Sequence, residues 1–358
     1  MGNATRASYL KTDIHAICDR LGPRVKDFAG KTVLLTGAHG FLGRYLVAVF
    51  AEMADRLDRP CHVVAMDNFI SSQDESRPSG SAVTFLKHDV IDPYPAAALH
   101  RKIDFVIPAA GLASPAYYKR FPLETIDVTT IGLRRALDVA RDHDARLLYF
   151  SSSEIYGDPV ESAVPTPETY RGNVASLGPR ACYDESKRLG ETLCYTYAEK
   201  FAVPAKIVRP FNVFGPGLSR NDLRVIPNFG SRIIDGKPIE VYGTGRQTRT
   251  FCYVVDAIVG FLTVLLDGKG GEAYNVGNPT PEISRVELVP KLAAILGKPV
   301  DFRVIDYPVN YPADEPMRRC PDITKVRALG YEPKVDLDEG LRRFFRWAEQ
   351  AYLFEQPA

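Results

Sequence analysis

The run "KTVLLTGAHGFLG", residues 31–43, constrains the fold of this chain more than any other segment. Its first half is an unbroken apolar run, which is typical of a strand buried on both faces of a parallel sheet. Glycines then recur where the strand gives way to a helical pattern. At such a junction they allow a tight turn and let the backbone approach a pyrophosphate at the helix N-terminus. The segment predicts a dinucleotide site at Gly37, Gly40, Phe41, Leu42 and Gly43.

Apolar runs of strand length recur along the chain and alternate with helical segments. Strands separated by helices imply right-handed crossovers and a doubly wound parallel sheet. The expected fold class is therefore α/β, a Rossmann-like sheet with a smaller, discontinuous C-terminal substrate-binding domain. Further strands are expected at 62–67, 83–90, 103–110, 146–153 and 205–215, and long helices at 41–57, at 123–141 and after Tyr183.

The local composition of the sequence changes after Gly215, where Gly, Arg and aromatic residues replace the long apolar runs. We predict an N-terminal helical extension, a NAD-binding domain and a nucleotide-sugar-binding domain. The second domain is expected to cap the carboxyl edge of the sheet, where open α/β sheets bind their ligands. The predicted ranges are 1–29 for the extension, 30–211 with 254–278 for the NAD-binding domain, and 212–253 with 279–350 for the other.

Acidic residues end two of the expected strands near the glycine loop. Asp67 stands where the dinucleotide fingerprint has a ribose-binding acid. Its carboxylate favours NAD over NADP because it would repel a 2′-phosphate. Asp89 ends the next strand, where an acid can contact adenine. Further cofactor contacts are predicted at Asn68, Val90 and Ala109.

The Gly-x-x-Gly-x-x-Gly spacing, closed by Phe-Leu-Gly, resembles the extended short-chain dehydrogenase/reductase family. That family carries Tyr-x-x-x-Lys, and "ACYDESK" supplies it as Tyr183 and Lys187. On a helix the two side chains share one face, so the ammonium can approach the phenol. A nearby cation, together with the positive nicotinamide, is expected to lower the pKa of the phenol. The phenolate can then take a hydroxyl proton while hydride leaves carbon for NAD.

The segment "LLYFSSSEIYG", residues 147–157, places three serines and an acid at the end of a strand. In the family pattern Ser152, four residues before Tyr156, hydrogen-bonds the sugar oxygen. Dehydratases that act on thymidine-linked glucose carry Asp-Glu at the next two positions, so Ser153 argues against that reaction. Ser-Glu occurs in both GDP-mannose dehydratases and UDP-glucuronate decarboxylases, so Ser153 and Glu154 alone do not separate these two.

Residues 31–347 resemble the UDP-glucuronate decarboxylase branch, for which "GPRACYDE" and "GRQTRTF" are distinctive. The resemblance implies oxidation at C4 of UDP-glucuronate, loss of CO₂ from the resulting β-keto acid, reprotonation of C5 and reduction to UDP-xylose by the same cofactor. It also implies that Glu154 and Arg319 carry the decarboxylation. The implied substrate contacts are Ala113, Pro115, Tyr118, Arg180, Asn212, Arg224, Val225, Tyr242, Arg249 and Arg319.

One departure from the branch leaves alternatives open. The decarboxylases read His-Leu-Ala-Ser-Pro after the fourth strand, whereas this chain has Gly111 at the first of these positions. A UDP-glucuronate 4-epimerase and a nucleotide-sugar 4,6-dehydratase are therefore the enzymatic alternatives. A NAD-binding scaffold without catalysis is the non-enzymatic one, and the intact set Ser152, Tyr183 and Lys187 argues against it.

The charge balance gives no reason to expect a nucleic-acid or membrane partner. Lys and Arg number 45, Asp and Glu number 44, and the net charge is +1. The six cysteines are scattered and the histidines form no H-E-x-x-H pattern, so no metal site is predicted and a reducing, cytoplasmic location is expected. No apolar run approaches the roughly 20 residues of a membrane span. The family resemblance implies a homodimer through a four-helix bundle that includes the helix after Tyr183.

Overall fold

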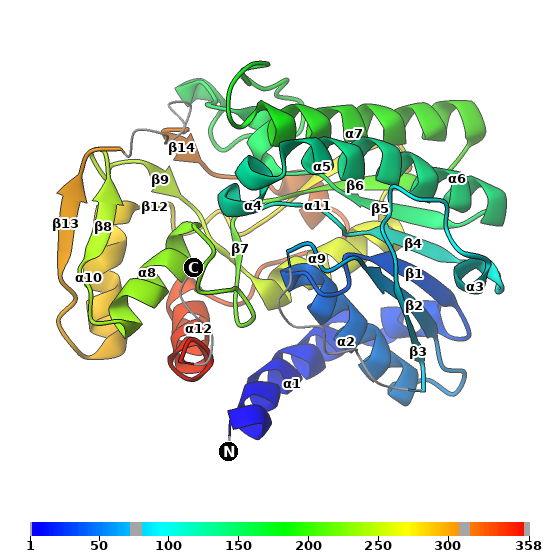
Figure 1. The fold of residues 1–358 in the computed structure, drawn as a ribbon, viewed down its shortest axis with the longest axis horizontal. Coiled ribbons are helices and arrows are strands. Elements are labelled where there is room, and N and C mark those ends of the chain that lie inside the picture. The colour runs from blue at the N-terminus through cyan, green and yellow to red at the C-terminus, as the bar shows by residue number, and fades with distance from the viewer. Residues whose placement is uncertain (1, 72–80, 308–315, 354–358) are drawn as a thin grey trace.

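The computed structural model describes residues 2–71, 81–307 and 316–353, with side chains from residue 11 onward (Figure 1). The predicted range 279–350 therefore contains residues, 308–315, that lie outside the described part. The main feature is a seven-stranded parallel sheet in the order β11-β6-β5-β4-β1-β2-β3. Its strands are β1 (Thr32–Thr36), β2 (His62–Asp67), β3 (Val83–Lys87), β4 (Phe105–Pro108), β5 (Arg146–Phe150), β6 (Ala205–Pro210) and β11 (Ala273–Val276).

The strand order reverses between β1 and β4. The chain runs outward from β1 to β3, then crosses back to β4 on the other side of β1. The loops that leave β1 and β4 therefore diverge and open a crevice at the carboxyl edge of the sheet, which is the usual ligand position in this architecture. The predicted doubly wound α/β fold is confirmed.

Helices cover both faces of the sheet and build two separate cores. Val33 and Leu35 of β1 pack in one core with α2 (Phe41–Arg56) and α9 (Val254–Asp267). Leu34 packs in the other with α6 (Leu133–His143) and α7 (Ala181–Phe201). Figure 1 shows α6 and α7 on one face of the sheet and α2 on the opposite face. The unbroken apolar run of β1 is explained by this two-sided burial.

The N-terminal extension forms α1 (Gly2–Leu21) and a 3₁₀ segment, η1 (Gly22–Phe28). Helix α1 packs against α2, α9 and α12 (Leu337–Ala351). Its Asp13 is buried, accepts hydrogen bonds from Tyr253 at 2.7 Å and Tyr45 at 3.3 Å, and pairs with Arg343 of α12. Burial raises the pKa of Asp13, and the two tyrosines and the arginine only partly offset this. The extension is therefore integrated into the fold.

Three predicted elements are interrupted in the structure. The strand predicted to end at residue 153 ends at Phe150, because Ser152 Oγ accepts the Glu154 N–H at 3.2 Å and begins the 3₁₀ turn η3 (Ser153–Tyr156). The strand predicted at 205–215 breaks after Pro210, where Asn212 adopts a φ of +40°, and resumes as β7 (Val213–Phe214). The helix predicted at 123–141 comprises α5 (Pro122–Asp127), the π-type turn η2 (Val128–Gly132) and α6.

The remaining elements lie mainly beyond the carboxyl edge of the sheet (Figure 1). Strand β9 (Thr248–Arg249) lies between β12 (Ile283–Ser284) and β14 (Arg318–Arg319), while β8 (Ile239–Tyr242) pairs with β13 (Phe302–Ile305). In this small sheet Arg249 is the register partner of Arg319. The other elements are α3 (Ala96–Leu99), α4 (Pro115–Arg120), η4 (Glu161–Ala163), α8 (Val225–Ile234), β10 (Cys252–Tyr253), which pairs with β7, α10 (Arg285–Leu296) and α11 (Thr324–Arg327).

Among the helices that the structure describes, none combines the length and the apolar character that a bilayer crossing would require.

Candidate active site

The predicted catalytic pair lies on the first turns of α7, beside the end of β5. Lys187 is buried, and its ammonium donates to the backbone oxygen of Phe150 at 2.7 Å. The same ammonium lies 5.7 Å from the ring centroid of Tyr183. Burial lowers the pKa of Lys187 to about 8. The shared helix face expected from the i, i+4 spacing is therefore present.

The hydroxyl of Tyr183 lies within hydrogen-bonding reach of Ser152, which acts to lower its pKa. The phenol ring is also stacked on Tyr118, with 5.4 Å between the ring centroids. The expected lowering of the tyrosine pKa is not found in the protein alone. Burial raises the pKa of Tyr183 to about 12, and this outweighs the opposite effect of Ser152. The phenol is held neutral until an added positive charge reaches it.

Glu154 is the centre of a charged cluster next to this pair. Arg319 approaches its carboxylate with two guanidinium nitrogens, one of them 2.7 Å from Oε2, and Arg180 pairs with the same oxygen. Arg180 is the residue that precedes α7, so it comes from the element that carries Tyr183. Arg249 lies beside Arg319 because strand β9 pairs with strand β14. Four residues that are far apart in the sequence are thus brought together.

The arginines determine the ionisation state of Glu154. Burial would raise its pKa, but Arg180, Arg319 and Arg249 outweigh burial and lower the pKa to about 2. Glu154 is therefore a carboxylate throughout the neutral range. A carboxylate between guanidinium groups makes charge-assisted hydrogen bonds, which fix its geometry well.

Asp184 is a further carboxyl group of this cluster that sequence reasoning missed. It is buried, lies 3.4 Å from Nε of Arg180, and follows Tyr183 directly in the sequence. Burial raises the pKa of Asp184 to about 7, although Arg180 acts in the opposite direction. Its position one turn after Arg180 on a helix was a usable signal, because i, i+4 side chains are neighbours.

The predicted cofactor residues lie around a cavity at the diverging loops of β1 and β4. Asp67 accepts backbone N–H groups from His39 at 2.8 Å and Phe69 at 2.7 Å, and Asp89 accepts from Asn68 at 2.9 Å. The predicted residues that line the cavity are Gly37, Gly40, Asp67, Asn68, Asp89, Val90 and Ala109. Lining residues that sequence reasoning missed are Ile70, Ser71, His88, Ile91, Ala110, Gly111, Leu112, Glu124, Asp127 and Val128.

The other three predicted residues of the glycine loop, Phe41, Leu42 and Gly43, do not line the cavity but support the loop that does. Phe41 and Leu42 begin α2 and pack against the core without lining the cavity. A Cβ at Gly43 would lie 1.9 Å from the backbone oxygen of Gly37, so only glycine lets α2 approach the loop this closely. The bare backbone turn, the helix N-terminus behind it and the carboxylate of Asp67 fit a dinucleotide.

We predict that Gly43→Ala weakens NAD binding and lowers the free energy of unfolding by about 1–3 kcal/mol, since the added methyl forces α2 away from the glycine loop. Titration with NAD and urea unfolding monitored by circular dichroism measure the two effects. Unchanged affinity together with unchanged stability would contradict the close approach.

The predicted substrate residues differ in how directly they meet this cluster. Tyr118, Arg180, Arg249 and Arg319 contact or adjoin it, as described above. Arg224 is paired with Asp222, 2.6 Å between Nη2 and Oδ2, and its charge reaches Tyr183. Asn212 donates to the backbone oxygen of Thr250 at 2.8 Å. Of the other predicted substrate residues, Ala113 is an exposed loop residue, Pro115 begins α4, Val225 begins α8 and Tyr242 ends β8.

Comparison with known proteins places the site in a wider context. The model of a family described as the NAD dependent epimerase/dehydratase family matches residues 33–277. The chain is 37% identical over 318 residues to UDP-glucuronic acid decarboxylase 1 of Xenopus tropicalis, covering 87% of this chain and 71% of that protein. It is 37% identical over 313 residues to UDP-glucuronic acid decarboxylase 5 of Arabidopsis thaliana, covering 86% of each. The structure of an epimerase from Methanothermobacter thermautotrophicus matches with a TM-score of 0.80 and 25% identity, covering 94% of this chain and 96% of that one.

Proposed function

Because this chain belongs to the NAD dependent epimerase/dehydratase family, we propose that it decarboxylates UDP-glucuronate to UDP-xylose with bound NAD. The observation that carries the proposal is the cluster of Arg180, Arg249 and Arg319 around Glu154, directly beside Tyr183. A carboxylate on the sugar finds guanidinium partners there, next to the group that takes the C4 proton. The two decarboxylases that are 37% identical to this chain support the same substrate.

The residues of the chain have separate tasks in this reaction. Tyr183 takes the proton of the C4 hydroxyl, and Ser152 donates a hydrogen bond to the C4 oxygen. The residues that line the cavity would hold NAD, which would supply a positive charge, the acceptor for the C4 hydride and the donor for the final reduction. Arg319 holds the sugar carboxylate until the C5–C6 bond breaks and CO₂ leaves, and Tyr183 and Ser152 then stabilise the enolate oxygen. C5 then takes up one proton that comes from solvent on the side of Glu154 and Arg319, since the ionised Glu154 has none to give, and C4 is reduced last.

The test is incubation of the purified protein with UDP-glucuronate and NAD, with measurement of CO₂ and identification of the sugar nucleotide. We expect CO₂ and UDP-xylose in equal amounts. UDP-galacturonate without CO₂ would make the protein a 4-epimerase, an alternative that the epimerase structure and Gly111 keep open. Turnover of a neutral hexose nucleotide, without turnover of UDP-glucuronate, would indicate a 4,6-dehydratase. If neither substrate is turned over, the protein would be a NAD-binding scaffold.

We also propose that the protein is a homodimer that pairs α5 and α7 with the same helices of a second copy. The two helices pack against each other, and large apolar side chains remain exposed on them, namely Leu123, Ile126, Leu189 and Tyr195. Large apolar side chains that are exposed on neighbouring helices are common at protein interfaces.

The six cysteines are unpaired, which supports a reducing, cytoplasmic location.

Leu189→Glu is expected to convert the dimer to a monomer, because it places a charge in the apolar contact of α7. Light scattering coupled to gel filtration measures the mass. Val304→Glu, on the exposed strand β13 at the other end of the molecule, is the matched control and should leave the mass unchanged (Figure 1). A monomeric wild-type protein, or a Leu189→Glu variant with the wild-type mass, would contradict the proposed interface.

A further inference from the structure

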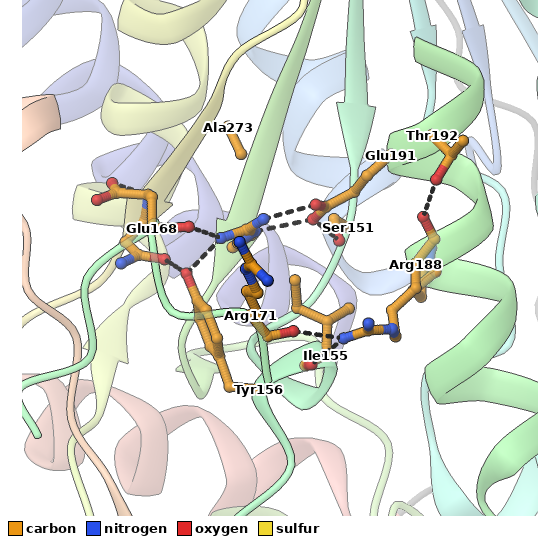
Figure 2. A network of polar contacts seen from close by, with 12 residues as sticks. Ser151, Ile155, Tyr156, Glu168, Arg171, Arg188, Glu191, Thr192 and Ala273 are labelled. Carbon is orange, nitrogen blue, oxygen red and sulfur yellow. Dashed lines mark hydrogen bonds and ion pairs between the residues drawn. The ribbon is translucent and has the colours of Figure 1, made fainter. Parts of the chain in front are cut away.

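A buried polar network lies behind the loop that carries Ser152 and Glu154 (Figure 2). Arg209 of β6 pairs with both oxygens of Glu191 on α7, at 2.8 and 2.6 Å. The same guanidinium donates to the hydroxyl of Tyr156 at 2.6 Å and to the backbone oxygen of Glu168 at 3.0 Å. The Tyr156 hydroxyl in turn donates to Asn275 of β11 at 2.7 Å. These groups are almost fully satisfied, and such networks are rigid because every broken bond leaves a buried polar group unpaired.

The network holds both ends of the loop. At the start of the loop, Ser151 donates to Glu191 at 2.6 Å. At its end, Tyr156 is fixed by Arg209 and Asn275, and Figure 2 shows its ring directed into the network. Ser152 and Glu154 lie between these two anchors, yet neither takes part in the network. The backbone that carries them is therefore held at both ends by residues that face away from the site.

The same network reaches the strand that carries Arg319. Asn275 donates through its amide to the backbone oxygens of Thr166 at 2.9 Å and Asp322 at 3.0 Å. The backbone of Thr166 also pairs with Cys320 and with Asp322, the residues just after Arg319. Asn275 thus connects the segment that carries Glu154, through Tyr156, to the segment that carries Arg319, through Asp322.

We propose that Tyr156, held by Arg209 and Asn275, is a positioning residue that sets Glu154 against Arg319 for the C5 step, while Ser151, held by Glu191, positions Ser152 for the C4 step. This inference rests on the proposed decarboxylase function. The physical basis is that a supporting shell must fix a reacting group closely, since a displacement of about 1 Å can cost about 10²-fold in rate. Each anchor is nearer to one of the two groups, so removing one anchor should affect one step more than the other.

The experiment compares Tyr156→Phe with wild type, using stopped-flow absorbance of NADH for C4 oxidation and CO₂ release for the C5 step. We expect CO₂ release to fall by about tenfold to hundredfold while the oxidation rate changes little, so that NADH accumulates transiently. Tyr274→Phe is the matched control. Tyr274 is buried on the same strand as Asn275, and its hydroxyl accepts the N–H of Lys269 rather than a bond of the network, so neither rate should change.

Ser151→Ala provides the second variant, which leaves the Tyr156 anchors intact. It should slow C4 oxidation and leave no excess of NADH. The proposal would be overturned if Tyr156→Phe slowed both steps equally and also lost NAD binding or thermal stability. It would also be overturned if both variants kept wild-type rates. If wild-type protein and Tyr274→Phe make no UDP-xylose, the proposed function fails. Hydrogen exchange of residues 151–156 then tests the network separately: faster exchange in Tyr156→Phe than in Tyr274→Phe supports it, and equal exchange overturns it.

Discussion

Tyr183→Phe is expected to lower the turnover of UDP-glucuronate by about 10²–10⁴-fold, because it removes the group that takes the C4 proton. The ring would still stack on Tyr118, so the fold and the cofactor site should be preserved. Both CO₂ release and transient NADH formation should be lost together, since no later step can occur without oxidation at C4. Steady-state CO₂ production, single-turnover absorbance and a NAD titration measure these effects.

Tyr197→Phe serves as the control for this change. Tyr197 lies on the same helix α7, and its hydroxyl donates to Asp138 at 2.8 Å, on the side of the helix that faces α6. Its removal should leave turnover near the wild-type value. A Tyr183→Phe variant that still oxidises the sugar at a wild-type rate would remove Tyr183 from its assigned role.

Glu154→Gln is expected to separate the two halves of the reaction. The change removes a charge that the pKa of about 2 keeps permanently negative, and leaves the side chain similar in size. CO₂ release should fall by about 10²–10³-fold, the range found when one preorganised electrostatic group is removed. The KM for UDP-glucuronate should fall as well, because Arg180 and Arg319 lose their competing carboxylate. NADH should accumulate, since Tyr183, Ser152 and Lys187 are unchanged.

The same substitution at Glu161, exposed in η4, is the control and should change neither parameter. Loss of both steps together with loss of NAD binding in Glu154→Gln would assign Glu154 a purely structural role. A rise in KM would contradict the competition between Glu154 and the sugar carboxylate for the same arginines.

Local patterns in the sequence were sufficient for the elements that depend on nearby residues. Six of the seven strands of the large sheet, the glycine loop and the placing of Tyr183 and Lys187 on one helix face follow from periodicity and spacing, which act over a few residues. The edge strand β11 was not predicted. The breaks at Phe150 and Asn212 were missed, because a serine cap and a left-handed asparagine override the apolar pattern around them.

The charged cluster depended on information that local patterns lack. Arg249 and Arg319 meet only because β9 pairs with β14, and no periodicity specifies which short strands pair. The raised pKa of Asp184 likewise depends on burial by other elements of the fold. Family resemblance supplied Glu154 and Arg319 as reacting groups, whereas their mutual ion pair was visible only in three dimensions.

The pairing of Asp13 with Arg343 has a consequence for how the protein folds during synthesis. Asp13 and Arg343 are 330 positions apart, and Asp13 also accepts a hydrogen bond from Tyr253, so two of its three side-chain partners are synthesised long after the first helix. Burying a carboxylate has a high free-energy cost until those partners are present. We therefore expect stable docking of the first helix to follow the synthesis of the last one. Although domains generally fold in the order of their synthesis, this chain completes its core only when both of its ends are available.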